Sequence, residues 1–155
     1  MTGRTRPIHR VLQEAASVQA SPDLPITLAT LALAQARIVS DALHEDVVPR
    51  VPSVQRTFPN AIARRIGSGH IFDQRFVDDL RALAANLERQ VEIGTHRGWQ
   101  ADEHHVRGGY ETIHREDGIA RLESAVADIE TLAEAISATL CAVEAARIVD
   151  DLATG

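Results

Sequence analysis

The strongest pattern in the chain is the segment Ile119–Val143, which reads IARLESAVADIETLAEAISATLCAV. Its apolar residues recur at alternating intervals of three and four; they are Ile119, Leu122, Val126, Ile129, Ala133, Ile136, Leu140 and Val143. This spacing places them on one stripe of an α-helix. It predicts a long amphipathic helix over 119–152, about 50 Å in length. The last one or two turns should fray or project, because Arg147 and Asp150 take the next positions of the stripe.

Weaker helical patterns precede this segment and are separated by breaks. The predicted helices cover residues 7–20, 25–46, 60–66 and 73–94, and Gly94 is expected to end the fourth. Prolines at 49, 52 and 59 predict an extended connector over 47–59, since the residue before a proline disfavours the helical conformation. Residues 95–118 contain Gly108 and Gly109 and predict either two short helices or one weak helix.

The composition agrees with an all-helical protein. Only five of the 155 residues are aromatic, and helix-favouring Ala, Leu, Arg and Glu are abundant. We therefore expect an all-α fold without a sheet, as a single domain over 1–155. The expected architecture is a bundle of four to five helices with a long C-terminal helix, and residues 1–6 are expected to be flexible.

The same composition suggests where the protein occurs. The chain has 24 alanines and no lysine, and all of its 16 basic residues are arginine, which is typical of a bacterium with a high-GC genome. A lone Cys141 favours a reducing, cytoplasmic location, and it is expected in the core or at an interface. The least polar segment, 24–36, is too short to span a bilayer, which takes about 20 residues. No membrane association is expected.

Charge is distributed unevenly along the chain. The net charge is −6, yet residues 47–72 contain no acidic residue and include Arg50, Arg56, Arg64 and Arg65. This segment is the candidate surface for an anionic partner, either an acidic protein or a nucleic acid. Residues 61–80 have the outline of a helix-turn-helix, but Asp73, Asp78 and Asp79 would face the phosphates.

Two spacing patterns in the chain are typical of metal binding or catalysis. Asp41–His44 and Glu111–His114 have the carboxylate-x-x-His spacing of di-iron bundles, but the additional glutamates lie off the apolar stripes, so neither a metal nor a cofactor is expected. The histidine-rich segment 96–114 is expected to be exposed, with a pH-sensitive contact as the alternative. Arg65–His70 fits the Arg-x4-6-His pattern of HEPN ribonucleases, which also fits three other places in this chain.

Three classes of function remain open. The first is a non-enzymatic assembly or adaptor protein that forms a homodimer through the last helix, at Ile129, Ala133, Ile136, Leu140 and Val143, because the other predicted helices are too short to cover its whole stripe. Antiparallel packing is favoured, since Glu130 and Glu134 would repel each other in a parallel pair. The second is a regulatory protein that binds nucleic acid through 50–65, and the third is a metal-dependent enzyme. Partner, pathway and substrate are not specified by the sequence.

Overall fold

The computed structural model describes residues 23–104 and 116–154, and these residues are helical with no strand among them. The described residues form four α-helices: α2 (Leu24–Ala42), α3 (Thr57–Ser68), α4 (Gln74–His104) and α5 (Glu116–Thr154). A π-helical turn, η1 (Leu43–Val47), and two 3-10 turns, η2 (Val48–Arg50) and η3 (Ser53–Gln55), join α2 to α3. The predicted all-α class is confirmed. The predicted helix over 7–20 lies outside the described residues.

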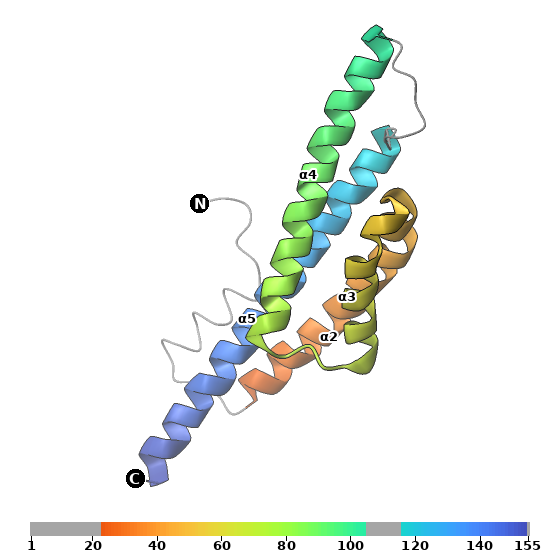
Figure 1. Ribbon diagram of the computed structural model, residues 1–155. Helices are drawn as coiled ribbons and strands as arrows, with labels where there is room; N and C mark the ends of the chain where they lie inside the picture. Colours follow the sequence, from red (N-terminus) through yellow and green to blue (C-terminus); the bar gives the residue numbers. More distant parts are fainter. Residues whose placement is uncertain (1–22, 105–115, 155) are drawn as a thin grey trace.

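Helix α5 is the axis on which the rest of the fold is assembled. Both α2 and α4 pack along it, and α4 runs antiparallel to it (Figure 1). Helix α3 returns beside α2 and leads through a short turn into α4. Two contacts fix the register of α2: the Gln35 side-chain amide donates to the Asp128 carbonyl at 2.9 Å, and Arg121 pairs with Asp46 at 3.1 Å.

The predicted stripe of α5 is core for most of its length. Leu122, Val126, Ile129, Ala133 and Ile136 are all buried within the monomer. The buried face widens toward the middle of the helix to include small residues that the stripe omits: Ala135, Ala138, Thr139 and Ala142. It widens because α5 has neighbouring helices on more than one side, and small side chains allow their close approach. The long C-terminal helix is therefore present, but one stripe does not describe it.

Helix α4 is longer than the sequence predicts. It continues through Gly94 to His104, so the expectation that Gly94 ends the helix was wrong. One glycine in a helix interior costs only about 1 kcal/mol relative to alanine, which is too little to stop a helix that packs on a neighbour. The added length lets α4 cover more of α5 than the sequence analysis assumed.

Two other helix boundaries differ from the prediction for similar reasons. Helix α3 begins at Thr57 instead of Asn60. Pro59 lies in its first turn, where backbone N–H groups have no acceptor within the helix, so the N–H that proline lacks is not missed. Helix α5 begins at Glu116 and includes Gly118, which was expected to separate two segments. Gly118 is buried, and a glycine there presents no side chain to its neighbours.

Candidate functional site

The arginines of the basic connector are largely used within the chain. Arg50 donates to the carbonyls of Glu45 and Asp46 at 3.1 and 3.2 Å, and Arg56 Nε donates to the Val51 carbonyl at 3.1 Å. These carbonyls lie where the regular helix of α2 has ended, so they lack the usual helical donors. The two arginines therefore stabilise the irregular backbone of the connector, and their guanidinium groups are partly occupied.

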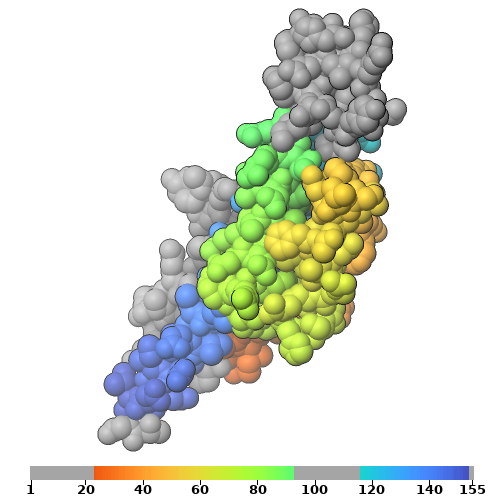
Figure 2. Space-filling view, in the orientation of Figure 1, coloured from red at the N-terminus to blue at the C-terminus, as the bar shows by residue number. Residues whose placement is uncertain are grey.

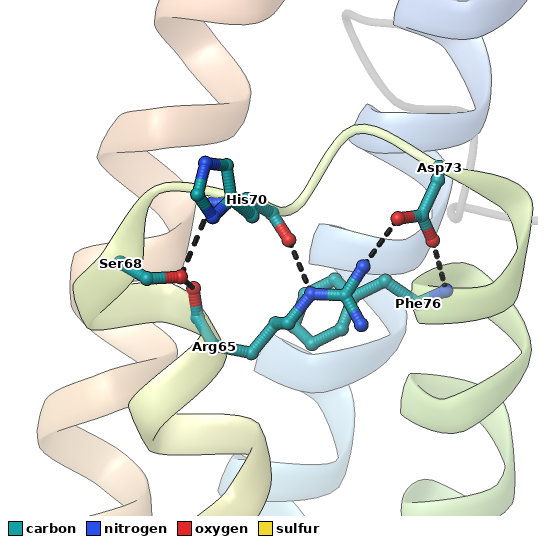
Figure 3. Close-up of polar contacts among 5 residues, drawn as sticks. All are labelled: Arg65, Ser68, His70, Asp73 and Phe76. Carbon is teal, nitrogen blue, oxygen red and sulfur yellow. Dashed lines mark hydrogen bonds and ion pairs between the residues drawn. The ribbon is translucent and has the colours of Figure 1, made fainter.

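Arg65 organises the junction between α3 and α4 (Figure 3). Its Nε donates to the His70 carbonyl, and its Nη2 pairs with Asp73 Oδ2. The guanidinium also lies over the ring of Phe76, 5.3 Å from its centroid. Asp73 in turn accepts the Phe76 backbone N–H at 2.7 Å, the N-cap that the sequence predicts.

The turn between these helices separates Arg65 from the His70 ring. Helix α3 ends at Ser68, and Gly69 follows with a φ of 79° while donating to the Ile66 carbonyl, a conformation that favours glycine. His70 lies beyond the helix and is exposed, and its ring is directed away from the guanidinium (Figure 3). Because Arg65 is already paired with Asp73, this Arg-x4-His match does not form a helical ribonuclease site.

The geometry of α3 and α4 also bears on the helix-turn-helix outline. The two helices lie side by side and run in opposite directions (Figure 1). Helix-turn-helix motifs instead cross at a wide angle of about 90–120°. Of the four candidate arginines, only the exposed Arg64 has no described hydrogen bond or ion pair. The structure therefore does not gather Arg50, Arg56, Arg64 and Arg65 into one free cationic surface.

Two of the four candidate metal ligands lie within the described residues. Asp41 and His44 are both exposed on the α2 side, and His44 Nδ1 is 2.8 Å from the Ser40 carbonyl. Glu111 and His114 lie outside the described residues. Within the part of the chain that the structure describes, no group of three or more His, Cys, Asp or Glu side chains could hold a metal ion.

Four glutamates of α4 and α5 lie around a groove between these two helices. Glu88 and Glu92 of α4 face Glu123 and Glu130 of α5 around a groove of about 350 Å³. Val91, Val126 and Ala127 also line this groove. Sequence reasoning placed these glutamates off the apolar stripes, and the structure shows them flanking the contact between two helices.

The residues predicted for self-association divide into two groups. Ile129, Ala133 and Ile136 are buried inside the monomer, at 0–1% exposure, so their proposed place on a free surface was wrong. Leu140 is half-buried against the core, whereas Val143 is 48% exposed. The cause is that α2 and α4 both pack along α5 and together cover the first part of the stripe, while the end of α5 extends beyond them.

Exposed apolar side chains gather at one end of the molecule. Among the described residues nine large apolar side chains are exposed; besides Val54 they are Ile26, Leu31, Leu33 and Ile38 of α2, and Val143, Ile148, Val149 and Leu152 of α5. The start of α2 and the end of α5 lie together at the same end (Figure 1), and the end of α5 extends beyond the body of the molecule (Figure 2). Ile26 and the four residues of α5 lie at this end, and we call these five residues the apolar end; Leu31, Leu33 and Ile38 lie farther along α2, toward the Gln35–Asp128 contact.

Helix α2 has an exposed face that is not purely polar. Leu31, Ala34 and Ile38 follow a three-four spacing on one flank of the buried face, and Ile26 and Leu33 are seven residues apart on the other. By length and composition, Leu24–Arg50 is also the one described helical segment that is able to cross a membrane, a criterion that core helices of soluble proteins meet as well. The apolar run over 24–36 is only 13 residues long, so it did not indicate that the longer segment Leu24–Arg50 meets this criterion.

A charged cluster lies at the other end of the α2–α5 contact. Asp46 pairs with Arg121 at 3.1 Å and lies 3.9 Å from Arg50. Burial raises the pKa of the nearby Asp128 carboxyl above its usual 3.8, and the negative charge of Asp46 raises it further. This cluster holds α2 against α5 at the end opposite to the apolar end.

Comparison with known proteins does not extend this description. No family model matches the chain, and neither a curated protein nor a solved structure is significantly similar to it. The function is therefore inferred from the geometry of the described residues.

Sequence reasoning missed the exposed apolar residues of α2. It interpreted an apolar helix as one that is surrounded by other helices. The available signal was the pair of seven-residue repeats, Ile26 with Leu33 and Leu31 with Ile38, which lie on both flanks of the buried residues Leu28 and Val39.

Proposed function

We propose that this chain is a helical assembly protein that acts through protein–protein contacts and forms a homodimer through the apolar end. The observation that carries the proposal is the concentration of exposed apolar side chains at one end, on two helices that meet there. Soluble monomers rarely expose a contiguous apolar patch of more than a few hundred Å². A second copy presents an identical patch, and a two-fold contact covers both at once.

The end of α5 has the pattern of a helix contact. Cys141, Ala145, Ile148 and Leu152 are spaced by four, three and four residues, and all but the half-buried Ala145 are exposed. The register set by Gln35 and Asp128 places the start of α2 near residues 135–139 of α5, so the following turns have no α2 beside them. The 12 residues after Ala142 extend about 18 Å.

This proposal keeps the self-association expected from the sequence but changes its location. The contact is centred on Ile148 and on the exposed start of α2 at Ile26, instead of on Ile136. A nucleic-acid function has less support, because Arg50, Arg56 and Arg65 already bind carbonyls or a carboxylate of their own chain.

Light scattering coupled to size-exclusion chromatography tests the proposal at micromolar concentration. The wild-type chain should have twice the 16.9 kDa mass of one chain. Ile148→Asp should have the mass of one chain and unchanged helicity, because Ile148 is 51% exposed and its replacement leaves the core intact. Val54→Asp is the matched control: Val54 is 87% exposed but lies in η3, so the mass should remain that of a dimer.

Three outcomes would overturn the proposal. The first is a wild-type mass of one chain. The second is a monomeric wild type whose variant lacking residues 1–20 dimerises, which would mean that the N-terminal segment covers the apolar end. The third is flotation of the wild-type chain with phosphatidylcholine vesicles, abolished by Ile148→Asp, which would assign the apolar end to a membrane surface.

A further inference from the structure

A pocket of about 310 Å³ lies between the connector and α4, away from the apolar end. Its apolar lining comes from both sides: Val51, Phe58 and Pro59 from the connector and the start of α3, and Leu83 and Leu87 from α4. Four of these side chains are buried and Phe58 is half-buried. The pocket volume is at the lower end of the range found for small-molecule sites, about 300–1,000 Å³.

The rim of the pocket is polar. Gln55, Asn86 and Arg89 are exposed there, and Gln90 is half-buried. The Gln90 side-chain amide donates to Gln55 Oε1 at 2.6 Å, which joins the two walls at the surface. An apolar interior with a few amide groups and one charge at its mouth is the usual composition of a site for a small organic ligand.

The charge at this rim has one sign. Arg89 is the single charged residue among those that line the pocket, and the connector wall belongs to the acid-free segment 47–72. No described carboxylate pairs with Arg89. A guanidinium next to apolar surface favours an anion and offers it two parallel hydrogen bonds.

The connector wall is held in place without a ligand. Arg56 donates to the carbonyl of Val51, a lining residue, and Arg50 anchors the preceding turn to the carbonyls of Glu45 and Asp46. A pocket whose walls are already fixed loses little conformational freedom when it binds a ligand. The arginines predicted to bind an anionic partner thus shape a pocket in which a different arginine is available.

We propose that this pocket binds a small monocarboxylate with an apolar body, of the size of a medium-chain fatty acid. The apolar chain packs on Phe58, Leu83 and Leu87. The carboxylate pairs with Arg89 and accepts a hydrogen bond from the Asn86 side-chain amide. This site is separate from the apolar end, so it does not depend on dimer formation.

Isothermal titration with octanoate and with its neutral analogue octanamide tests the proposal on the full chain. Octanoate should bind the wild type more tightly, by about tenfold, which is the usual value of a charge-assisted contact. Arg89→Gln should remove this preference and leave octanamide binding unchanged. Arg81→Gln is the matched control, because Arg81 is exposed on the same helix but does not line the pocket.

A second variant separates binding in the pocket from adsorption elsewhere. Asn86→Trp places a large side chain at the mouth without touching the core, because Asn86 is exposed. It should abolish binding of both probes with unchanged thermal unfolding, whereas Ile148→Asp, at the apolar end, should leave both affinities as they are. Equal affinity of the wild type for both probes, or octanoate binding that persists in Asn86→Trp, would overturn the proposal.

Discussion

The two parts of α5 have similar residues and opposite surroundings. In the first part, Ile129 and Ile136 are fully buried against neighbouring helices; in the last part, Ile148 and Leu152 are 51% and 76% exposed. Both parts are rich in alanine, and both carry apolar residues at three-four spacing. The difference shows that hydrophobic periodicity indicates which face of a helix needs a neighbour, but not whether the neighbour belongs to the same chain.

Helix α2 repeats the contrast across its width. Leu28 and Val39 are fully buried against α5, while Leu31 and Ile38, only a few residues away, are about half exposed. An apolar helix at the edge of a fold is thus half core and half exposed surface. Substitutions along α5 test this division, and the one at Ile136 should have the largest effect.

Replacement of Ile136 by Asp should unfold the chain. Ile136 is 0% exposed, and an unpaired carboxylate there costs several kcal/mol, a large part of the 5–15 kcal/mol that typically stabilises a domain. Far-ultraviolet circular dichroism of the soluble fraction measures the loss of helix. Ile148→Asp is the matched control and should remain helical. If Ile136→Asp gave a folded, soluble monomer, Ile136 would belong to an interface between copies.

Truncation of the same side chains should separate the two parts by free energy. Ile129→Ala should lower the free energy of unfolding by about 3 kcal/mol, within the range for a buried isoleucine, because it leaves a cavity between packed helices. Ile148→Ala should lower it by less than about 0.5 kcal/mol under conditions in which the chain is monomeric. Urea denaturation at low protein concentration measures both, and equal losses would refute the division.

Labelling of Cys141 tests where the exposed part begins. This cysteine is exposed and lies on the same side of α5 as Ala145, Ile148 and Leu152, so dimer formation should shield it. Its reaction rate with a thiol reagent should rise several-fold on dilution of the wild type. A cysteine introduced at the exposed Ser124, with Cys141 replaced by Ser, provides the control and should react at one rate at all concentrations. A constant rate for Cys141 would exclude it from the contact.

Much of the fold followed from local chemistry. The helical class, the Asp73 cap, and the burial of Leu122, Val126 and Ile129 all depend on spacing and capping that the sequence shows directly. The end of α4 did not follow, because tertiary packing outweighs the small cost of Gly94. The dimer prediction failed at Ile129 and Ile136 for another reason: α2 and α4 pack on α5 together, and the spacing along one helix does not show how many neighbours will cover it.

The candidate sites were harder to predict, because they depend on contacts between distant residues. Arg56 and Arg65 are basic in the sequence, but only the fold shows that Val51 and Asp73 occupy them. The pocket next to Arg89 combines residues from 51–59 with residues from 83–90, and neither segment has a motif of its own. The charge pattern along the chain does not show which arginines bind groups of their own chain; of the four candidates, only Arg64 has no described hydrogen bond or ion pair.

Replacement of Asp128 by Asn should have the smallest effect, and its sign is determined by pH. Burial, and then the charge of Asp46, raise the pKa of this carboxyl in the folded state, so the folded chain binds more protons than the unfolded chain as pH rises past 3.8. The free energy of unfolding therefore falls through this range, and the penalty is complete at neutral pH.

Asp128→Asn should remove this penalty and stabilise the protein at pH 7 by about 0.5 kcal/mol. The Gln35 contact is kept, because it uses the Asp128 carbonyl. Below about pH 3, where the carboxyl is protonated in both states, the difference should disappear. Urea denaturation at both pH values measures it, with Asp41→Asn, an exposed carboxylate on α2, as the matched control. A destabilised Asp128→Asn variant at pH 7 would show that the carboxylate forms a favourable contact at the α2–α5 interface and that its charge is not a cost there.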